Sequence, residues 1–379
     1  MNAPRTYLDH NATAPLRPEA RHALLAALEA VGNPSSVHAE GRRARGLIED
    51  AREQVAALVN SRPAEIVFTS GATEANNWLM AAGWDTVLVS GIEHDSVLAP
   101  ARASGARVID LPARADGTVA VESVAAQAPE VASAMGRTIV TLQLANNETG
   151  ALQPVAETAA VARAHGLCFH TDAVQAVGRH AVDFAALGVD ALSLSSHKIG
   201  GPKGVGALVV RDGVRLSPFI VGGGQERRRR AGTENVAAIA GFGAAAAAAQ
   251  KDLERIGRIA ALRDRLEREA VGIAPETAVI AGETARLPNT TCLALPGQSA
   301  EILVIKLDLS GIAVSAGAAC SSGKVGQSHV LAAMGIAPDL ARAAIRISLG
   351  WNSTEADVDA FLRAWSEIAE SAARKRAVA

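Results

Sequence analysis

Short apolar runs that alternate with helical patterns constrain this chain more than any other feature. Six such runs lie between residues 65 and 213, and each ends in polar or glycine-rich residues: EIVFTSG, DTVLVSG, RTIVTLQLANNETG, LCFHTDAVQ, DALSLSSHK and VGALVVRDG. Strands that alternate with helices predict βαβ units and a mostly parallel sheet. Because such sheets bind ligands at the carboxyl ends of their strands, we expect the polar residues of these runs to converge on one site.

The rest of the sequence predicts a second, smaller α/β unit. An alanine-rich helical stretch extends from about residue 235 to residue 271, and the strand patterns NTTCLALPG, IAVSAGAAC and AAIRISLG follow it. A helical pattern, SAEILVIKLDLSG, lies among these strands. We therefore expect an N-terminal segment over residues 1–15, a large domain over residues 16–250, and a linking helix with a small domain over residues 251–379.

Composition excludes several classes of function. The 379 residues include 37 basic and 39 acidic side chains, so the net charge gives no indication of a nucleic acid or an anionic membrane as partner. The first 15 residues lack the apolar core of a signal peptide, and the longest apolar run, residues 236–249, is too short to span a bilayer. We expect a cytoplasmic protein that folds around a sizeable core.

The three cysteines predict neither a metal site nor a disulfide framework. Cys168, Cys292 and Cys320 form no C-x-x-C pair and no Cys/His cluster. The first two lie in apolar segments, where a cysteine is most often a small buried hydrophobe. Cys320 lies instead in SAGAACSSGKVG, residues 315–326, whose small residues offer little side-chain packing and predict a mobile thiol.

For a lysine at the position of Lys198, the ordinary interpretation is a solvated side chain at the end of a strand. It follows an apolar strand in SLSSHKIGGPKG, beside His197 and a glycine-rich loop. A lysine must lose its proton to attack a carbonyl, and partial burial near other cations favours that loss. A nucleotide-binding loop is the competing interpretation, but GGPKGVG matches neither G-x-G-x-x-G nor the P-loop spacing.

Two further segments give Lys198 a chemical context. In FTSGATEANN an apolar strand turns through Ala72 and Thr73 into a helix, and such a start binds anions, although most such turns are plain connections. In FHTDAVQAVG, Asp172 ends a strand, where it serves either as a helix cap or as the partner of a protonated ring nitrogen. A lysine, a phosphate site and an acidic partner together indicate pyridoxal 5′-phosphate, with Lys198 as the Schiff-base lysine.

Ten ordered segments resemble one known family over nearly the whole chain. They are YLDHNATAP, NPSSVHAEGR, FTSGATEANN, EHDSV, NNETG, TDAVQAVG, SSHKIGGPKGVGAL, GGGQERRRRAGTENV, GAACSSG and IRISLG. The family is the cysteine desulfurases of the NifS/IscS type, within the class V, fold-type I pyridoxal-phosphate enzymes. The resemblance implies a large domain with a mostly parallel sheet flanked by helices, and a smaller C-terminal α/β domain.

The resemblance also implies the roles of individual residues. Lys198 would bind the cofactor and His94 would lie against its ring, where it acts as an acid or a base. Asp172 would pair with the ring nitrogen. The other implied cofactor contacts are Asn146 and Gln175 around the ring oxygen, and Ala72, Thr73, Ser195 and His197 at the phosphate. Thr233 would reach the phosphate of a neighbouring subunit, which implies a homodimer, and Asn11 and Arg346 would bind the substrate carboxylate.

By the same resemblance, Cys320 would attack the sulfur of L-cysteine, carry it as a persulfide and leave L-alanine as product. An iron–sulfur scaffold or another protein would accept the sulfur, but the residues do not identify which. The chain ends soon after WSEIAESAARKRAVA, whereas longer relatives use a longer tail to dock the scaffold.

Two alternatives remain open at this point. An aminotransferase or β-lyase of the same class would leave Cys320 incidental, and a non-catalytic binding or assembly protein would not need the lysine, aspartate and cysteine. The run of four arginines at residues 227–230 is either a partner surface or a solvated or intersubunit charge cluster.

Overall fold

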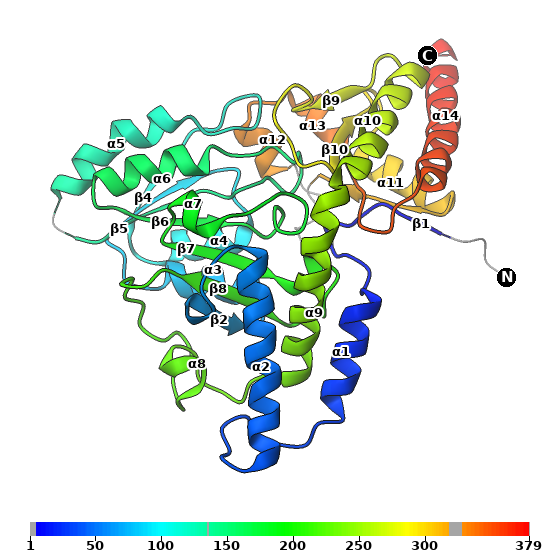
Figure 1. Ribbon diagram of the computed structural model, residues 1–379. Helices are drawn as coiled ribbons and strands as arrows, with labels where there is room; N and C mark the ends of the chain where they lie inside the picture. Colours follow the sequence, from blue (N-terminus) through cyan, green and yellow to red (C-terminus); the bar gives the residue numbers. More distant parts are fainter. Residues whose placement is uncertain (1–4, 135, 318–327, 379) are drawn as a thin grey trace.

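All six apolar runs form strands of one seven-stranded sheet. The computed structural model (Figure 1) describes residues 5–134, 136–317 and 328–378. The strand order is β2-β8-β7-β6-β5-β3-β4, with all neighbours parallel except those of β8. The expected mostly parallel sheet is therefore confirmed. Its strands are β2 (Ile66–Thr69), β3 (Thr86–Ser90), β4 (Arg107–Leu111), β5 (Thr138–Thr141), β6 (Cys168–Asp172), β7 (Ala191–Ser195) and β8 (Gly206–Val210).

The C-terminal strand patterns form a separate antiparallel sheet. Its order is β12-β13-β10-β9, with bounds of Ser315–Ala316, Ala344–Ser348, Thr290–Ala294 and Ala278–Ile280. A two-stranded parallel sheet pairs β1 (Thr6–Tyr7) with β11 (Ile312–Ala313), and Asp9 bridges to Ser348. Leu8 is fully buried in the apolar cluster of the small sheet. The N-terminal segment thus packs on elements more than 300 residues away in the sequence.

Helices cover these sheets (Figure 1). None of the described helices is long and apolar enough to cross a membrane. Their bounds are α1 Pro18–Leu28, α2 Ala39–Leu58, α3 Ala72–Met80, α4 Asp95–Ala103, α5 Val121–Ser133, α6 Val155–Ala164, α7 Phe184–Leu187, α8 Gln225–Arg228, α9 Val236–Asp252, α10 Ile256–Ile273, α11 Ala300–Leu309, α12 His329–Ala333, α13 Pro338–Arg342 and α14 Glu355–Val378.

The expected linking helix is two helices rather than one. A short 3₁₀ turn, Leu253–Arg255, separates α9 from α10. The two helices pack on different neighbours, because α9 lies between α1 and α2 whereas α10 lies beside α14 (Figure 1). Just before the turn, Asp252 forms an ion pair with Arg17, which directly precedes α1, with the two charged groups 2.7 Å apart. The break lets the chain change partners between the large and small sheets.

Close helix packing explains the small residues of α9 better than helix propensity alone. A Cβ atom on Gly243 would lie 2.5 Å from Ala51 Cα on α2. On the same helix, a Cβ atom on Gly241 would lie 2.7 Å from Cγ of Pro202, in the loop after Lys198. Real Cβ atoms do not approach backbone so closely, so α9 can reach α2 only with glycine at residue 243.

We predict that Gly243→Ala destabilises the protein by about 1–3 kcal/mol, because overpacking outweighs the better helix propensity of alanine. The matched control is Gly46→Ala in α2, where an added Cβ meets nothing within 4 Å. That variant should be neutral or more stable by up to about 1 kcal/mol. Urea unfolding of both variants tests the difference, and equal effects would contradict the packing argument.

Candidate active site

A cavity of about 520 Å³ lies at the carboxyl ends of the central strands. Segments from the N-terminus, the β2–α3 turn, the start of α4, the end of β6 and the loop after β7 line it. Eight of the predicted residues line this cavity: Ala72, Thr73, His94, Asp172, Gln175, Ser195, His197 and Lys198. Topology therefore brings together side chains that lie up to 126 residues apart in the sequence (72 to 198).

Lys198 is held by the N-terminal segment. It lies in a 3₁₀ turn, Ser196–Lys198, and its Nζ donates to the backbone carbonyls of Asn11 at 2.5 Å and Ala12 at 3.0 Å. Backbone hydrogen bonds from Ala14 to His197 and from Arg17 to Gly200 fasten the segment along the same turn. The backbone that carries Lys198 is therefore held in place, and its side chain lines the cavity.

Asp172 presents a carboxylate at the end of β6, and its side chain is mostly buried. Its Oδ1 accepts from the backbone N–H of Val174 at 3.0 Å, and its Oδ2 accepts from Nδ2 of Asn76 at 2.8 Å. Donors to both oxygens stabilise the negative charge and fix the plane of the group. A buried, oriented carboxylate of this kind can hold a proton on a basic ring nitrogen.

The cavity also has groups that suit an anion. The first turn of α3 contributes Ala72 and Thr73, and positive charge gathers at a helix N-terminus. A side chain at Gly206 of β8 would lie 2.7 Å from the backbone carbon of Gly71, so glycine there lets the turn approach β8. Ser195 adds a hydroxyl group.

His197 also lines the anion-binding part of the cavity. Its Nδ1 lies 3.2 Å from Thr13 Oγ1. Burial, with Lys198 and Lys203 nearby, lowers the pKa of His197 to about 4. At neutral pH this imidazole is therefore an uncharged hydrogen-bonding group.

His94 caps α4 with its own ring. Nδ1 accepts from the backbone N–H of Ser96 at 3.0 Å and lies 2.7 Å from Ser96 Oγ. Burial lowers the pKa of His94, the charge of Lys198 lowers it further, and Asp172 opposes the shift. The ring is therefore neutral at physiological pH.

The two predicted substrate residues lie together, beside the cavity rather than in its lining. Arg346 donates to the carbonyl of Asn147 at 3.1 Å, and Asn11 donates to the same carbonyl at 3.2 Å. Arg346 also pairs with Asp9 at 2.8 Å, and its Nε is buried without a partner among the described residues. Since Asn147 does line the cavity, this pair stands directly behind its wall.

Two other predicted residues lie outside the cavity lining. The Oδ1 atom of Asn146 accepts from the backbone of Glu148 and Thr149, at 2.8 and 2.9 Å, and so folds the NNETG turn. Thr233 is exposed, on the loop before α9. The adjacent Asn147, and not Asn146, lines the cavity. The sequence NNETG alone does not predict which of its two asparagines does so.

Several lining or adjacent residues were not predicted. Asn76 follows Ala72 by four residues, so the helix period places both on one face of α3, and that signal was available in the sequence. Ser96 lies two residues after His94 and lines the cavity, as do Gln143 and Lys203. Gln143 follows β5 within one of the runs whose polar residues were expected to converge, although it was not singled out there.

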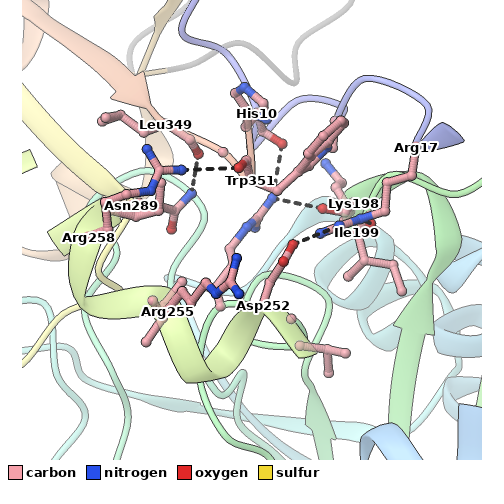
Figure 2. A pocket seen from close by; sticks show the side chains of 17 residues that line it. His10, Arg17, Lys198, Ile199, Asp252, Arg255, Arg258, Asn289, Leu349 and Trp351 are labelled. Carbon is pink, nitrogen blue, oxygen red and sulfur yellow. Dashed lines mark hydrogen bonds and ion pairs between the residues drawn. The ribbon is translucent and has the colours of Figure 1, made fainter. Parts of the chain in front are cut away.

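A smaller cavity of about 150 Å³ lies behind Lys198 (Figure 2). Arg179, fully buried there, donates to the carbonyls of His10 and Lys198, each at 3.0 Å, and to the side chain of Gln175. Arg17 and its ion-pair partner Asp252 also line this cavity (Figure 2). Arg179 therefore ties the lysine turn, the N-terminal segment and a cavity residue into one unit.

The thiols that the structure describes are poorly suited to attack. Cys292 is completely buried, as expected, and burial raises its pKa above the usual range. Cys168 is half-buried, and burial together with Asp190 raises its pKa to about 12. A thiol must be deprotonated to act as a nucleophile. Cys320 lies outside the described residues, between Gly317 and Ser328.

Metal ligation has no support in the part of the chain that is described. No group of three His, Cys, Asp or Glu side chains there has an arrangement that could hold a metal ion.

Comparisons with known proteins agree on one family. The family model Aminotransferase class-V matches residues 6–361. The chain is 42% identical to a cysteine desulfurase of Cereibacter sphaeroides, over 97% of this chain and 96% of that protein. The solved structure of a NifS-like protein from Rickettsia africae matches with a TM-score of 0.89 and 35% identity, over 97% of this chain and 99% of that one. A structure of SspA in complex with cysteine matches with a TM-score of 0.76 and 31% identity, over 91% of this chain and 98% of that one.

One buried acid gives a pH prediction. Glu93 is fully buried beside His94; its Oε1 accepts from the backbone of Gln143 at 2.5 Å, and its Oε2 has no partner among the described residues. Burial and the charge of Asp172 raise its pKa from 4.5 to about 8. Between these pH values the folded protein holds a proton that the unfolded chain releases, so Glu93 lowers the free energy of unfolding as pH rises.

Glu93→Gln cannot titrate and should therefore remove that loss. We expect the decrease in the free energy of unfolding from pH 5 to pH 8 to be smaller in the variant by about 2–4 kcal/mol. Denaturant unfolding at both pH values measures it, with Glu122→Gln, whose side chain is 82% exposed, as the control. An unchanged pH dependence in Glu93→Gln would show that Glu93 is ionised in the folded protein.

Proposed function

Because this chain belongs to the class V aminotransferase family, and within it to the pyridoxal-phosphate-dependent cysteine desulfurases, we propose that it converts L-cysteine to L-alanine and transfers the sulfur to Cys320. The activity is assigned from the sequence identity of 42% to a cysteine desulfurase, which extends over nearly the whole of both chains. The arrangement of Lys198, Asp172 and the α3 turn around one cavity supports the assignment of the site residues.

The residues of the cavity fit the cofactor. Lys198, whose Nζ donates to backbone carbonyls of the N-terminal segment, lines the same cavity as the mostly buried side chain of Asp172 and the first turn of α3. We propose that Lys198 holds the cofactor covalently, that Asp172 contacts its ring nitrogen, and that Gln175 lies at its ring oxygen. Ala72, Thr73, Ser195 and His197 would hold its phosphate. When bound, pyridoxal 5′-phosphate supplies an electron sink for negative charge that develops at Cα of the substrate.

The protein itself supplies proton transfer and orientation. Lys198 would remove the proton from Cα of L-cysteine, since its Nζ enters the cavity from a fixed turn. Asp172 would keep the ring nitrogen protonated, and the donors on its two oxygens prevent its carboxylate from rotating away. His94 would lie against the ring, and Asn146 would act by folding the turn that carries Asn147.

In the sulfur step, the sulfur atom of the substrate cysteine passes to the thiol of Cys320. We propose that the Cys320 thiolate attacks the substrate sulfur, so that a sulfur–sulfur bond forms as the substrate carbon–sulfur bond breaks. The electron pair of the broken bond remains with the substrate carbon, which takes up a proton. L-Cysteine and a protein thiol thus become L-alanine and a protein persulfide, with no external oxidant or reductant.

Arg346 and Asn11 would bind the substrate carboxylate. The guanidinium fork matches two carboxylate oxygens, and the Nε of Arg346 is buried without a partner among the described residues. Arg346 also lies opposite Ser315 in the small sheet, and the segment that contains Cys320 begins at Gly317, two residues after Ser315. The carboxylate and the attacking thiol would therefore be anchored to the same sheet.

The wider setting is also a proposal. We propose a homodimer in which the exposed Thr233 reaches the phosphate of the neighbouring subunit, a cytoplasmic location, and an iron–sulfur scaffold or other protein as sulfur acceptor. Within each chain, residues 16–250 would form the large domain, residues 251–379 would form the linking helix and the small domain, and residues 1–15 would pack near the active site and the small domain. Pairing of β1 with β11 and the contacts of Asn11 support that role for the N-terminal segment.

Cys320→Ser should abolish persulfide formation and leave the absorbance spectrum of the bound cofactor unchanged, because it removes the nucleophile alone. Anaerobic incubation with L-cysteine, followed by mass spectrometry of the Cys320 peptide and of alanine, measures both products. Cys168→Ser is the control and should retain full activity, since its thiol is held protonated. A fully active Cys320→Ser enzyme would indicate an aminotransferase or β-lyase instead.

Arg346→Ala should lower kcat/KM for L-cysteine about 100-fold, mainly through KM, because charge-assisted hydrogen bonds to the carboxylate are lost. Arg346→Lys keeps the charge without the fork and should recover only part of the loss. Arg342→Ala, an exposed arginine four residues earlier, is the control and should behave as wild type. Steady-state kinetics measure kcat and KM for L-cysteine in each variant, and a wild-type KM in Arg346→Ala would refute the assignment.

A further inference from the structure

One buried amide connects the two groups that are proposed to flank the cofactor ring. Asn76 lies on α3 and has no exposed surface. Its Nδ2 donates to Asp172 Oδ2 at 2.8 Å and to Ser96 Oγ at 2.9 Å. The two hydrogens of one NH₂ group therefore bind two different side chains of the site. We call the bond to Asp172 the first arm, and the bond to Ser96, which contacts His94, the second or His94 arm.

The orientation of this amide is unambiguous. If the amide were flipped, its oxygen would face the Asp172 carboxylate, and two acceptors would meet in a buried space. Hydrogen-bond chemistry therefore requires Nδ2 to point toward Asp172. The other amide atom, Oδ1, is buried with no partner in the part of the chain that is described.

The second arm reaches His94 through Ser96. Since Ser96 Oγ accepts from Asn76, its own proton is available to Nδ1 of His94, 2.7 Å away. The backbone N–H of Ser96 can only donate, and it also points at Nδ1, at 3.0 Å. Two donors thus converge on Nδ1, which must be unprotonated, and the neutral ring carries its proton on Nε2.

Stability alone does not explain an asparagine at this place. A buried amide oxygen without a partner weakens folding, and this cost offsets part of what the two hydrogen bonds of Nδ2 contribute. Sites that do chemistry are where natural chains accept such a cost. The position therefore indicates a functional role.

We infer that Asn76 is a positioning residue, which orients the Asp172 carboxylate and, through Ser96, holds His94 as the Nε2–H tautomer. The inference rests on the proposed function, and it refines the expected role of His94. In this tautomer the neutral ring donates a hydrogen bond from Nε2 and cannot accept a proton there. His94 would then orient and stack, whereas Lys198 carries the proton.

Titratable groups surround His94 on several elements, and each affects a pH titration of the site. They are Asp172 on β6, Lys198 after β7, Asp95 on α4 and His329 on α12. The tautomer is therefore best measured directly on the ring nitrogens rather than inferred from a pH profile alone.

The first test is nuclear magnetic resonance of the holoenzyme labelled with ¹⁵N-histidine, in which long-range ¹H–¹⁵N correlations distinguish the tautomers. His94 is assigned by comparison with His94→Gln. We expect a protonated Nε2 and an unprotonated Nδ1 at neutral pH. A proton on Nδ1 would overturn the inference, whether or not the enzyme releases alanine from cysteine.

Three variants separate the two arms. Asn76→Leu keeps the shape and removes both hydrogen bonds, Ser96→Ala removes only the His94 arm, and Ser90→Ala is a matched buried serine whose Oγ has no partner among the described residues. We expect kcat to fall tenfold or more in Asn76→Leu and by less in Ser96→Ala, with no change in Ser90→Ala. The pH titration of cofactor absorbance should shift in Asn76→Leu.

We expect Asn76→Leu to lower kcat without lowering the stability of the fold. Its thermal midpoint should stay close to that of the wild type, because losing the unpartnered amide oxygen offsets the loss of the donor to Asp172. Wild-type kcat with an unshifted absorbance titration would overturn the positioning role. If the wild-type holoenzyme makes no alanine at all, the proposed reaction fails, while the tautomer and the absorbance titration still test Asn76.

Discussion

The hydrogen bonds from Lys198 Nζ to the carbonyls of Asn11 and Ala12 join the two halves of this protein at its reacting group. Asn11 also contacts Ser348 and Thr290 of the small sheet, and Asn289 just before it. The lysine turn belongs to the large sheet. A short N-terminal segment therefore sets the distance between the substrate-carboxylate residues and the proposed cofactor site. Arg179 reinforces the same junction from behind, through the carbonyls of His10 and Lys198.

Burial of polar groups gives the site its chemical character. His94 and His197 are held neutral, whereas Asp172 keeps donors on both carboxylate oxygens. Glu93, with one oxygen unpartnered among the described residues, remains protonated at neutral pH by the same physical cause. The two acids differ in their hydrogen bonds, because Glu93 accepts from one backbone donor whereas both oxygens of Asp172 accept from a donor.

Sequence reasoning recovered the parts of this site that depend on strand order alone. Lys198, Asp172 and Thr73 each follow an apolar run, and parallel strands bring such ends together regardless of packing details. The link from Asn76 to Ser96 was not predicted, because it depends on how α3 and α4 lie against each other in space. Likewise, the choice of Asn147 over Asn146 for the cavity depends on the local path of one turn. The break between α9 and α10 follows from tertiary neighbours, since the sequence is helical on both sides.

The pairing of β1 with β11 bears on when an active enzyme exists during synthesis. Residues 6 and 7 leave the ribosome among the first, yet their partners at 312 and 313 follow some 300 residues later. A nascent chain that has completed the seven-stranded sheet already contains the lysine turn but lacks the strands that hold Asn11. Contacts of such long sequence separation form late in folding. The full set of contacts around the lysine turn can therefore form only after the C-terminal strands have been synthesised.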